Sequence, residues 1–143
     1  MKPCVVDASV VAAAFFHETG AEAARAILAG GGELHAPDLL LAEVGNVVWK
    51  RHGRGEIDEA EARALLADCL RLPLRLVPTG DLVESALVLA LRTRRTVYDC
   101  LYLALAVRTK AVLVSGDRRF ASALAGSPFE KHVAWLGNPR ASA

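Results

Sequence analysis

Residues 4–16, CVVDASVVAAAFF, place a short apolar β-type run directly before one aspartate, Asp7, and an alanine-rich stretch typical of a helix. Residues 112–120, VLVSGDRRF, repeat this order around Asp117. Short apolar runs that alternate with longer helical stretches predict a parallel α/β sheet. Because open α/β sheets bind ligands beyond the carboxyl ends of their strands, both aspartates are expected at a ligand crevice.

The alternation continues along the whole chain. Strands are expected over residues 3–6, 34–36, 74–77, 111–115 and, at a sheet edge, 132–136. Helices are expected over residues 8–16, 21–29, 37–52, 59–72, 81–94, 99–109 and 117–124. We expect a single domain over residues 1–137 and a frayed tail over residues 138–143.

Composition excludes several classes of protein. The chain has 143 residues with 17 Lys+Arg against 16 Asp+Glu, so a strongly basic nucleic-acid-binding surface is not expected. The hydrophobic content of 53% favours burial of apolar surface against the chain itself or against a partner. No apolar run reaches the length of a membrane span. Three widely spaced cysteines predict a reduced, cytoplasmic protein with neither a disulfide framework nor structural zinc.

Two more acids stand inside apolar stretches. Glu43 lies within residues 39–49, LLLAEVGNVVW, and Asn46 shares its helical face, so a narrow polar stripe there would line a crevice. Asp99 lies within residues 97–106, VYDCLYLALA, which is otherwise almost free of polar residues. The ordinary alternative for each aspartate is a helix N-cap, and for Glu43 a solvated helix face.

Taken together, the four acids predict a metal site. Carboxylates that converge within a few ångströms repel one another, and a divalent cation removes that conflict. Oxygen ligands suit Mg²⁺ or Mn²⁺, which can orient a phosphodiester and activate a water molecule. We therefore predict Asp7, Glu43, Asp99 and Asp117 as catalytic and metal-binding residues.

At these residues the chain resembles the PIN-domain nucleases, especially the VapC-type toxins of bacterial toxin–antitoxin pairs. The resemblance rests on four motifs, VVDAS at residues 5–9, EVGN at 43–46, YDCLYLA at 98–104 and SGDRRF at 115–120. It implies a Rossmann-like parallel sheet flanked by helices and Mg²⁺- or Mn²⁺-dependent endoribonuclease activity. It also implies a homodimer, and a small antitoxin whose tail can block the acidic site.

The resemblance assigns supporting roles by position. Ser9 and Asn46 would be polar groups that support the acids, although Ser9 could equally cap the first helix. Arg94, Arg95, Arg118 and Arg119 lie beside Asp99 and Asp117 and are candidate contacts to RNA phosphates. Trp49 could stack on a base, but burial in the core or a dimer contact is the favoured interpretation.

Three other functions fit parts of the pattern. A phosphatase of the haloacid-dehalogenase type needs a second aspartate where this chain has Ser9, and a hydroxyl cannot replace that general acid at neutral pH. A phospho-receiver domain needs an acidic pair after the first strand, which has only Asp7. The third is a protein-binding module with a PIN fold but no catalysis.

Overall fold

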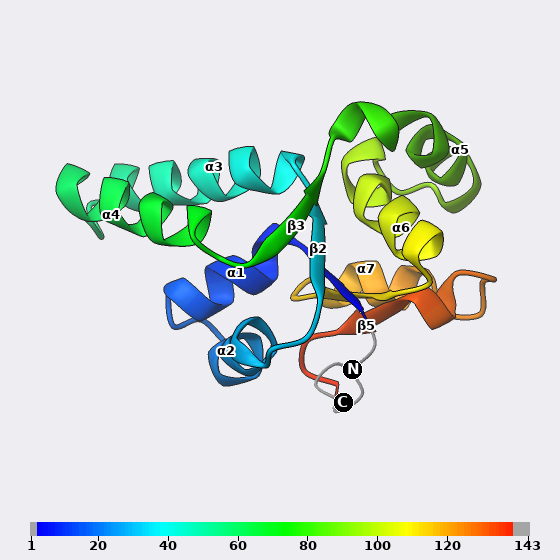
Figure 1. The fold of residues 1–143 in the computed structure, drawn as a ribbon, viewed down its shortest axis with the longest axis horizontal. Helices are drawn as coiled ribbons and strands as arrows, with labels where there is room; N and C mark the ends of the chain where they lie inside the picture. The colour runs from blue at the N-terminus through cyan, green and yellow to red at the C-terminus, as the bar shows by residue number, and fades with distance from the viewer. Residues whose placement is uncertain (1–2, 139–143) are drawn as a thin grey trace.

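The computed structural model describes residues 3–138 and contains a five-stranded, fully parallel sheet with the strand order β3-β2-β1-β4-β5 (Figure 1). The strands are β1 (Cys4–Val6), β2 (Leu34–Pro37), β3 (Leu74–Val77), β4 (Val112–Ser115) and β5 (Val133–Trp135). The helices are α1 (Ala8–Phe15), α2 (Ala21–Ala29), α3 (Leu39–Gly53), α4 (Glu59–Leu70), α5 (Val83–Thr93), α6 (Val97–Thr109) and α7 (Arg118–Ala123). Two short 3-10 helices are η1 (Thr79–Asp81) and η2 (Glu130–His132).

The sheet has a switch point between β1 and β4. From β1 the chain moves outward through β2 to β3, then returns past the starting strand to form β4 and β5 on the other side. Since such crossovers are right-handed, α1–α4 cover one face of the sheet and α5–α7 cover the other, as Figure 1 shows for α1–α4 and α6. The carboxyl ends of β1 and β4 are therefore neighbours that feed helices on opposite faces, which is where such sheets form a crevice.

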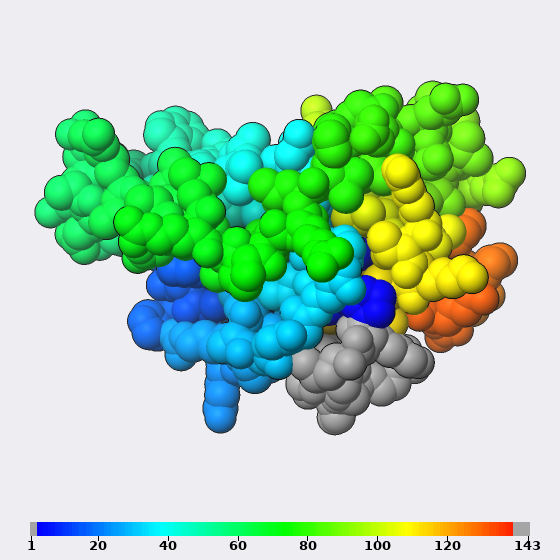
Figure 2. All heavy atoms as spheres, in the orientation of Figure 1, coloured from blue at the N-terminus to red at the C-terminus, as the bar shows by residue number. Residues whose placement is uncertain are grey.

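The core lies around β1 and α6. Val5 and Val6 of β1 are completely buried, and the start of the chain (dark blue) shows only as a small patch between later segments in Figure 2. In α6 every residue from position 100 to 106 is buried, because this helix packs against β1, β2 and β4 on one side and α5 on the other. A helix enclosed on nearly all sides explains why its sequence is apolar without a clear period.

The predicted single α/β domain with a parallel sheet is confirmed, with small shifts at the ends of elements. The helix expected from Asp99 begins at Val97, because the side chain of Thr96 accepts a hydrogen bond from the backbone N–H of Asp99 at 3.1 Å and so caps it. The helix expected to reach residue 72 ends at Leu70. Of the expected tail, only Asn138 lies within the described residues, and residues 139–143 lie outside them.

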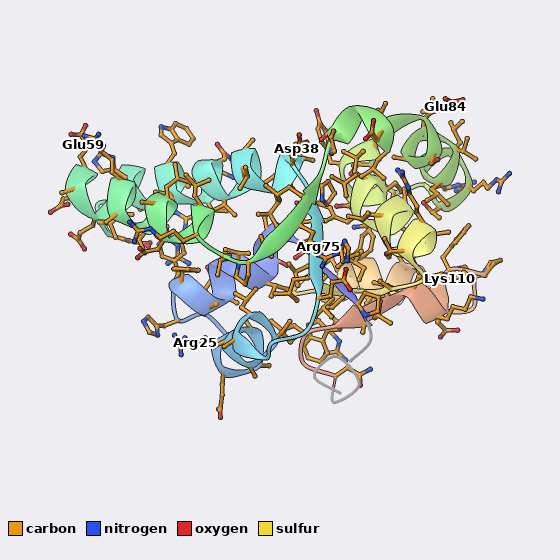
Figure 3. All side chains as sticks on the ribbon, viewed as in Figure 1. Arg25, Asp38, Glu59, Arg75, Glu84 and Lys110 are labelled. Atoms are coloured by element: carbon orange, nitrogen blue, oxygen red, sulfur yellow. The ribbon has the colours of Figure 1, made fainter. Side chains whose placement is uncertain are left out.

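Charges of both signs are spread over the outside of the molecule. Arg25, Glu59 and Glu84 project from outer helices in different directions (Figure 3). Trp49, for which burial in the core was one favoured interpretation, is 68% exposed, so that interpretation is wrong. Between residues 3 and 138, none of the helices combines the length and the apolar character that a bilayer crossing requires.

Candidate active site

All four predicted acids line one pocket at the carboxyl edge of the sheet. Asp7 follows β1, Asp117 follows β4, Glu43 comes from α3 and Asp99 from the first turn of α6. The full lining is Asp7, Ala8, Ser9, Glu43, Asp99, Tyr102, Leu113, Ser115, Asp117 and Phe120. The pocket thus lies at the switch point between β1 and β4, where a parallel sheet presents its ligand crevice.

Asp7 is both a helix cap and a pocket residue. Its Oδ1 accepts hydrogen bonds from the backbone N–H groups of Ser9 at 3.0 Å and Val10 at 3.3 Å, and a further bond from the Ser9 hydroxyl. Burial raises the pKa of the Asp7 carboxyl, and hydrogen bonds from Ser115 and Ser9 oppose that rise. The capping interaction occupies Oδ1 and fixes the side chain, so the carboxylate enters the pocket in a defined orientation.

Asp117 repeats this arrangement on the neighbouring strand. Its Oδ1 accepts from the backbone N–H of Arg119 at 3.0 Å and of Phe120 at 3.4 Å, which caps α7. Its own backbone N–H donates to the Ser115 hydroxyl at 3.0 Å. The Oδ2 atom of Asp117 takes no part in the cap.

Ser9 joins the two strand ends. Its hydroxyl donates to Asp7 and accepts from the backbone N–H of Gly116 at 2.7 Å. A Cβ atom at Gly116 would lie 3.0 Å from the Ser9 Oγ atom, so glycine permits this close approach. Ser9 therefore links the first turn of α1 to the residue that follows β4. Because Asp7 is the N-cap of α1, the alternative that Ser9 caps this helix is wrong.

Glu43 and Tyr102 form a second pair in the pocket. The Tyr102 hydroxyl donates a hydrogen bond to Glu43 Oε1. Burial raises the pKa of Glu43, the bond from Tyr102 opposes this, and the negative charges of Asp7 and Asp99 raise it further. Burial also raises the pKa of Tyr102, and its bond to Glu43 adds to the rise, so the phenol stays protonated as a donor.

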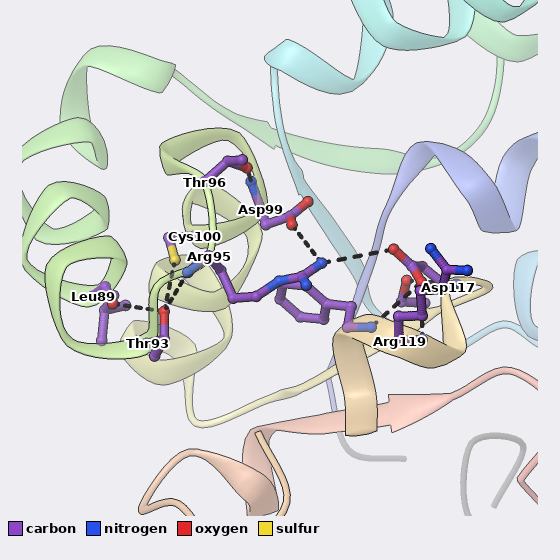
Figure 4. Close-up of polar contacts among 10 residues, drawn as sticks. Leu89, Thr93, Arg95, Thr96, Asp99, Cys100, Asp117 and Arg119 are labelled. Carbon is purple, nitrogen blue, oxygen red and sulfur yellow. Dashed lines mark hydrogen bonds and ion pairs between the residues drawn. The ribbon is translucent and has the colours of Figure 1, made fainter. Parts of the chain in front are cut away.

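The side chain of one arginine, Arg95, lies close to both Asp99 and Asp117. Arg95 lies in the connection between α5 and α6, and its Nη2 atom is 2.9 Å from Asp99 Oδ2 and 3.8 Å from Asp117 Oδ2 (Figure 4). Because Thr96 caps α6, the Asp99 carboxylate is free of a capping role, and the N-cap interpretation of this residue is wrong.

Other predicted residues are placed differently. Asn46 is exposed and is not part of the pocket lining, so its supporting role stays a prediction. Arg94, Arg118 and Arg119 are exposed, and the Arg118 guanidinium lies 4.9 Å from the centroid of the Trp135 ring.

Sequence reasoning missed five residues of the pocket lining. Two are the aliphatic Ala8 and Leu113, and the other three are Tyr102, Ser115 and Phe120. Tyr102 follows Asp99 by one helical turn, a spacing that could have indicated it. Ser115 and Phe120 flank Asp117 in the SGDRRF motif and carried no separate signal.

The donor set suits a hard divalent cation. Carboxylate and hydroxyl oxygens line the pocket, and the negative charges of Asp7 and Asp99 already raise the pKa of Glu43. Within residues 3–138 no three His, Cys, Asp or Glu side chains come close enough to enclose an ion by themselves. Mg²⁺ commonly binds through one or two carboxylates and keeps several waters, so an open site of this kind still fits it.

Comparison with known proteins decides the family. Residues 4–124 match the model of the PIN domain. The chain belongs to the PIN-domain family. It is 36% identical over 119 residues to "Ribonuclease VapC3" from Pyrobaculum aerophilum, an alignment that covers 82% of this chain and 91% of the relative. The resemblance to VapC-type PIN-domain proteins is therefore confirmed.

Solved structures show the same PIN fold. The crystal structure of PAE2754 from Pyrobaculum aerophilum superposes with a TM-score of 0.68 at 26% identity and covers 88% of this chain and 82% of that one. A toxin–antitoxin complex from Klebsiella pneumoniae contains a chain with a TM-score of 0.61 at 16% identity, with 93% and 97% of the two chains covered. The PIN fold extends over almost the whole chain.

Proposed function

We propose that this PIN-domain protein is a metal-dependent endoribonuclease that cleaves RNA phosphodiester bonds in the cytoplasm, as the toxin of a type II toxin–antitoxin system. The observation that carries the proposal is the convergence of Asp7, Glu43, Asp99 and Asp117 on one pocket at the switch point of the sheet. The name of the curated relative, a VapC ribonuclease, supports the reaction class.

The proposed cofactor is Mg²⁺ or Mn²⁺, held by oxygens of the four acids. When bound, such an ion polarises a phosphodiester and lowers the pKa of a coordinated water. The chain's own residues prepare the site for it. Ser9 and two backbone N–H groups orient Asp7, while the Tyr102 hydroxyl orients Glu43 and partly offsets the rise of its pKa.

RNA binding is proposed to rest on local cations beside the pocket. Arg118 and Arg119 begin α7 directly after Asp117, and Arg94 ends α5 close to Arg95 in the chain. All three are exposed, so their guanidinium groups can reach phosphates. Arg95 is instead engaged by two pocket carboxylates.

Association with other proteins is proposed from the apolar surface of α5. Val83, Leu87 and Leu91 follow one another at intervals of four residues and are 44%, 49% and 75% exposed. Residues at this spacing lie on one face of a helix and form an apolar strip. The strip supports both proposed partners, a second copy of this chain and a small antitoxin, and the structural relative from Klebsiella pneumoniae is a toxin–antitoxin complex.

Mn²⁺ titration of the purified, antitoxin-free protein tests the proposal. We expect Mn²⁺ to raise the melting temperature, because an ion that binds only the folded state stabilises it, by about 2.7 kcal/mol at a hundredfold excess over its Kd. The same concentrations should support cleavage of a labelled RNA, and chelation should stop it. If Mn²⁺ neither stabilises the protein nor supports cleavage, the nuclease proposal fails and the non-catalytic binding module is the better account.

A further inference from the structure

Arg95 is packed into the acidic pocket region and does not project into solvent. Its side chain is 24% exposed, and its guanidinium carbon lies 5.1 Å from the centroid of the Phe120 ring. Its Nη2 atom bonds to Asp99 Oδ2 at 2.9 Å and lies 3.8 Å from Asp117 Oδ2 (Figure 4). Arg95 lies between α5 and α6 in the chain. Its guanidinium therefore links this loop to the first turn of α6, through Asp99, and to the N-cap of α7, Asp117.

We propose that Arg95 is a built-in counter-ion that competes with the divalent cation for Asp99 and Asp117. The proposal rests on the metal site proposed above and adds a residue that regulates its occupation. In the metal-free protein the single positive charge of Arg95 is paired with Asp99 and lies near Asp117, so it offsets part of the repulsion between them. It must leave these carboxylates, wholly or in part, when a metal ion binds there.

The oxygen atoms that remain for a metal ion explain the competition. Asp117 Oδ1 caps α7, so Oδ2 is the atom left for a ligand, and that atom faces Arg95. Asp99 Oδ2 is bonded to the same guanidinium. Two cations that use the same oxygens repel each other strongly at such distances in a partly buried site.

The geometry of Arg95 also lowers the free-energy cost of moving its side chain away from the carboxylates. The Nε–H group is buried and has no hydrogen-bond acceptor among the described residues. A buried donor without a partner destabilises the position that it occupies. Movement of the side chain toward solvent would let water satisfy this group, which offsets part of the energy lost with the two carboxylates.

A positioning role for Arg95 would predict the opposite change in metal affinity when the residue is replaced. If Arg95 served to orient Asp99 and Asp117 as ligands, its removal would disorder them and weaken metal binding, as is common for groups that orient metal ligands. If Arg95 competes with the ion, its removal tightens metal binding and lowers the stability of the metal-free protein, because the repulsion between the acids is then uncompensated.

Isothermal titration calorimetry of the full-length chain with Mn²⁺, without RNA, measures directly whether replacing Arg95 raises or lowers the affinity for the ion. We expect Arg95→Met to bind Mn²⁺ at least about fivefold more tightly than the unmodified protein, the change that corresponds to roughly 1 kcal/mol. Methionine keeps an apolar contact with Phe120 but removes the charge. Arg95→Lys keeps the charge and should stay nearer to the original affinity.

Arg94→Met is the matched control. It removes the same charge from the adjacent, exposed position, and it should leave the Mn²⁺ affinity within about twofold, since exposed charges are screened by solvent and salt. In the metal-free state the melting temperature should fall for Arg95→Met more than for Arg94→Met. Circular dichroism verifies folding of each variant, and Arg95→Gln replaces Arg95→Met if the latter does not fold.

The outcomes distinguish a failure of the counter-ion role of Arg95 from a failure of the proposed metal site. Tighter binding by Arg95→Met with an unchanged Arg94→Met supports the counter-ion role. An equal or lower affinity of the neutral Arg95 variant, in a protein that does bind Mn²⁺, overturns that role and leaves the metal site standing. If neither the unmodified chain nor any folded variant binds Mn²⁺, the proposed metal site itself is wrong.

Discussion

Asp7→Asn is expected to abolish RNA cleavage while making the metal-free protein more stable. Asparagine keeps an oxygen that can accept the backbone N–H bonds of Ser9 and Val10, so the cap of α1 is retained. It removes a charge whose burial raises the pKa of the carboxyl. We expect cleavage to fall at least about 100-fold, since metal-ion catalysis contributes several kcal/mol. Loss of the buried charge should raise the metal-free melting temperature by roughly 4 °C, the shift for about 1 kcal/mol.

Asp58→Asn is the matched control for this prediction. Asp58 caps α4 through a hydrogen bond from the backbone N–H of Glu61 at 2.8 Å, but it is exposed and does not line the pocket. The same chemical change at this cap should leave cleavage unchanged. Cleavage by Asp7→Asn at the rate of the Asp58→Asn control would show that Asp7 is a helix cap only. A fluorescent RNA assay and thermal unfolding in the presence of a chelator provide both measurements.

Glu43→Gln is expected to reduce cleavage by a comparable factor and to change the pH dependence of stability. Burial and the nearby charges of Asp7 and Asp99 raise the pKa of Glu43 above its ordinary value of 4.5. A carboxyl with a raised pKa in the folded state binds its proton more tightly there than in the unfolded chain. Its stabilising effect is therefore complete below the ordinary pKa and is lost as the pH rises through the raised value.

The metal-free protein should consequently lose stability as the pH rises above about 4.5 through the raised pKa of Glu43, and Glu43→Gln should flatten this slope. Tyr102→Phe is the contrasting variant, because it keeps the Glu43 charge and removes the hydrogen bond that lowers its pKa. We expect Tyr102→Phe to extend the slope to higher pH. Urea unfolding between pH 4 and pH 8 measures both, and an identical slope in all three proteins would contradict this account of Glu43.

The sequence predicted the alternation of strands and helices and the edge at which the acids meet. Asp7 and Asp117 posed a choice between helix cap and active-site ligand, and the structure shows that capping and pocket lining occur in the same side chains. One carboxylate oxygen satisfies the helix terminus while the residue still lines the pocket, so the two interpretations were never exclusive. For Asp99 the choice was real, and the cap is Thr96.

What the sequence could not show are contacts between distant elements. Tyr102 and Glu43 are 59 positions apart and meet only because α3 and α6 converge on the same edge of the sheet. Arg95 looked like any other arginine beside a helix, and Arg95 and its neighbour Arg94 were equivalent candidates for RNA contact. Only the packing of Arg95 over Phe120 reveals that one of the two faces inward.

The most direct test of the central claim is the anomalous scattering of Mn²⁺ in crystals of the antitoxin-free protein soaked with that ion. The account predicts a peak in the pocket, in contact with Asp7 and at least one more of Glu43, Asp99 and Asp117. It also predicts that the same peak is lost in crystals of Asp7→Asn. An empty pocket at saturating Mn²⁺, or a peak that contacts none of these four carboxylates, would contradict the claim that they form a metal-dependent nuclease site.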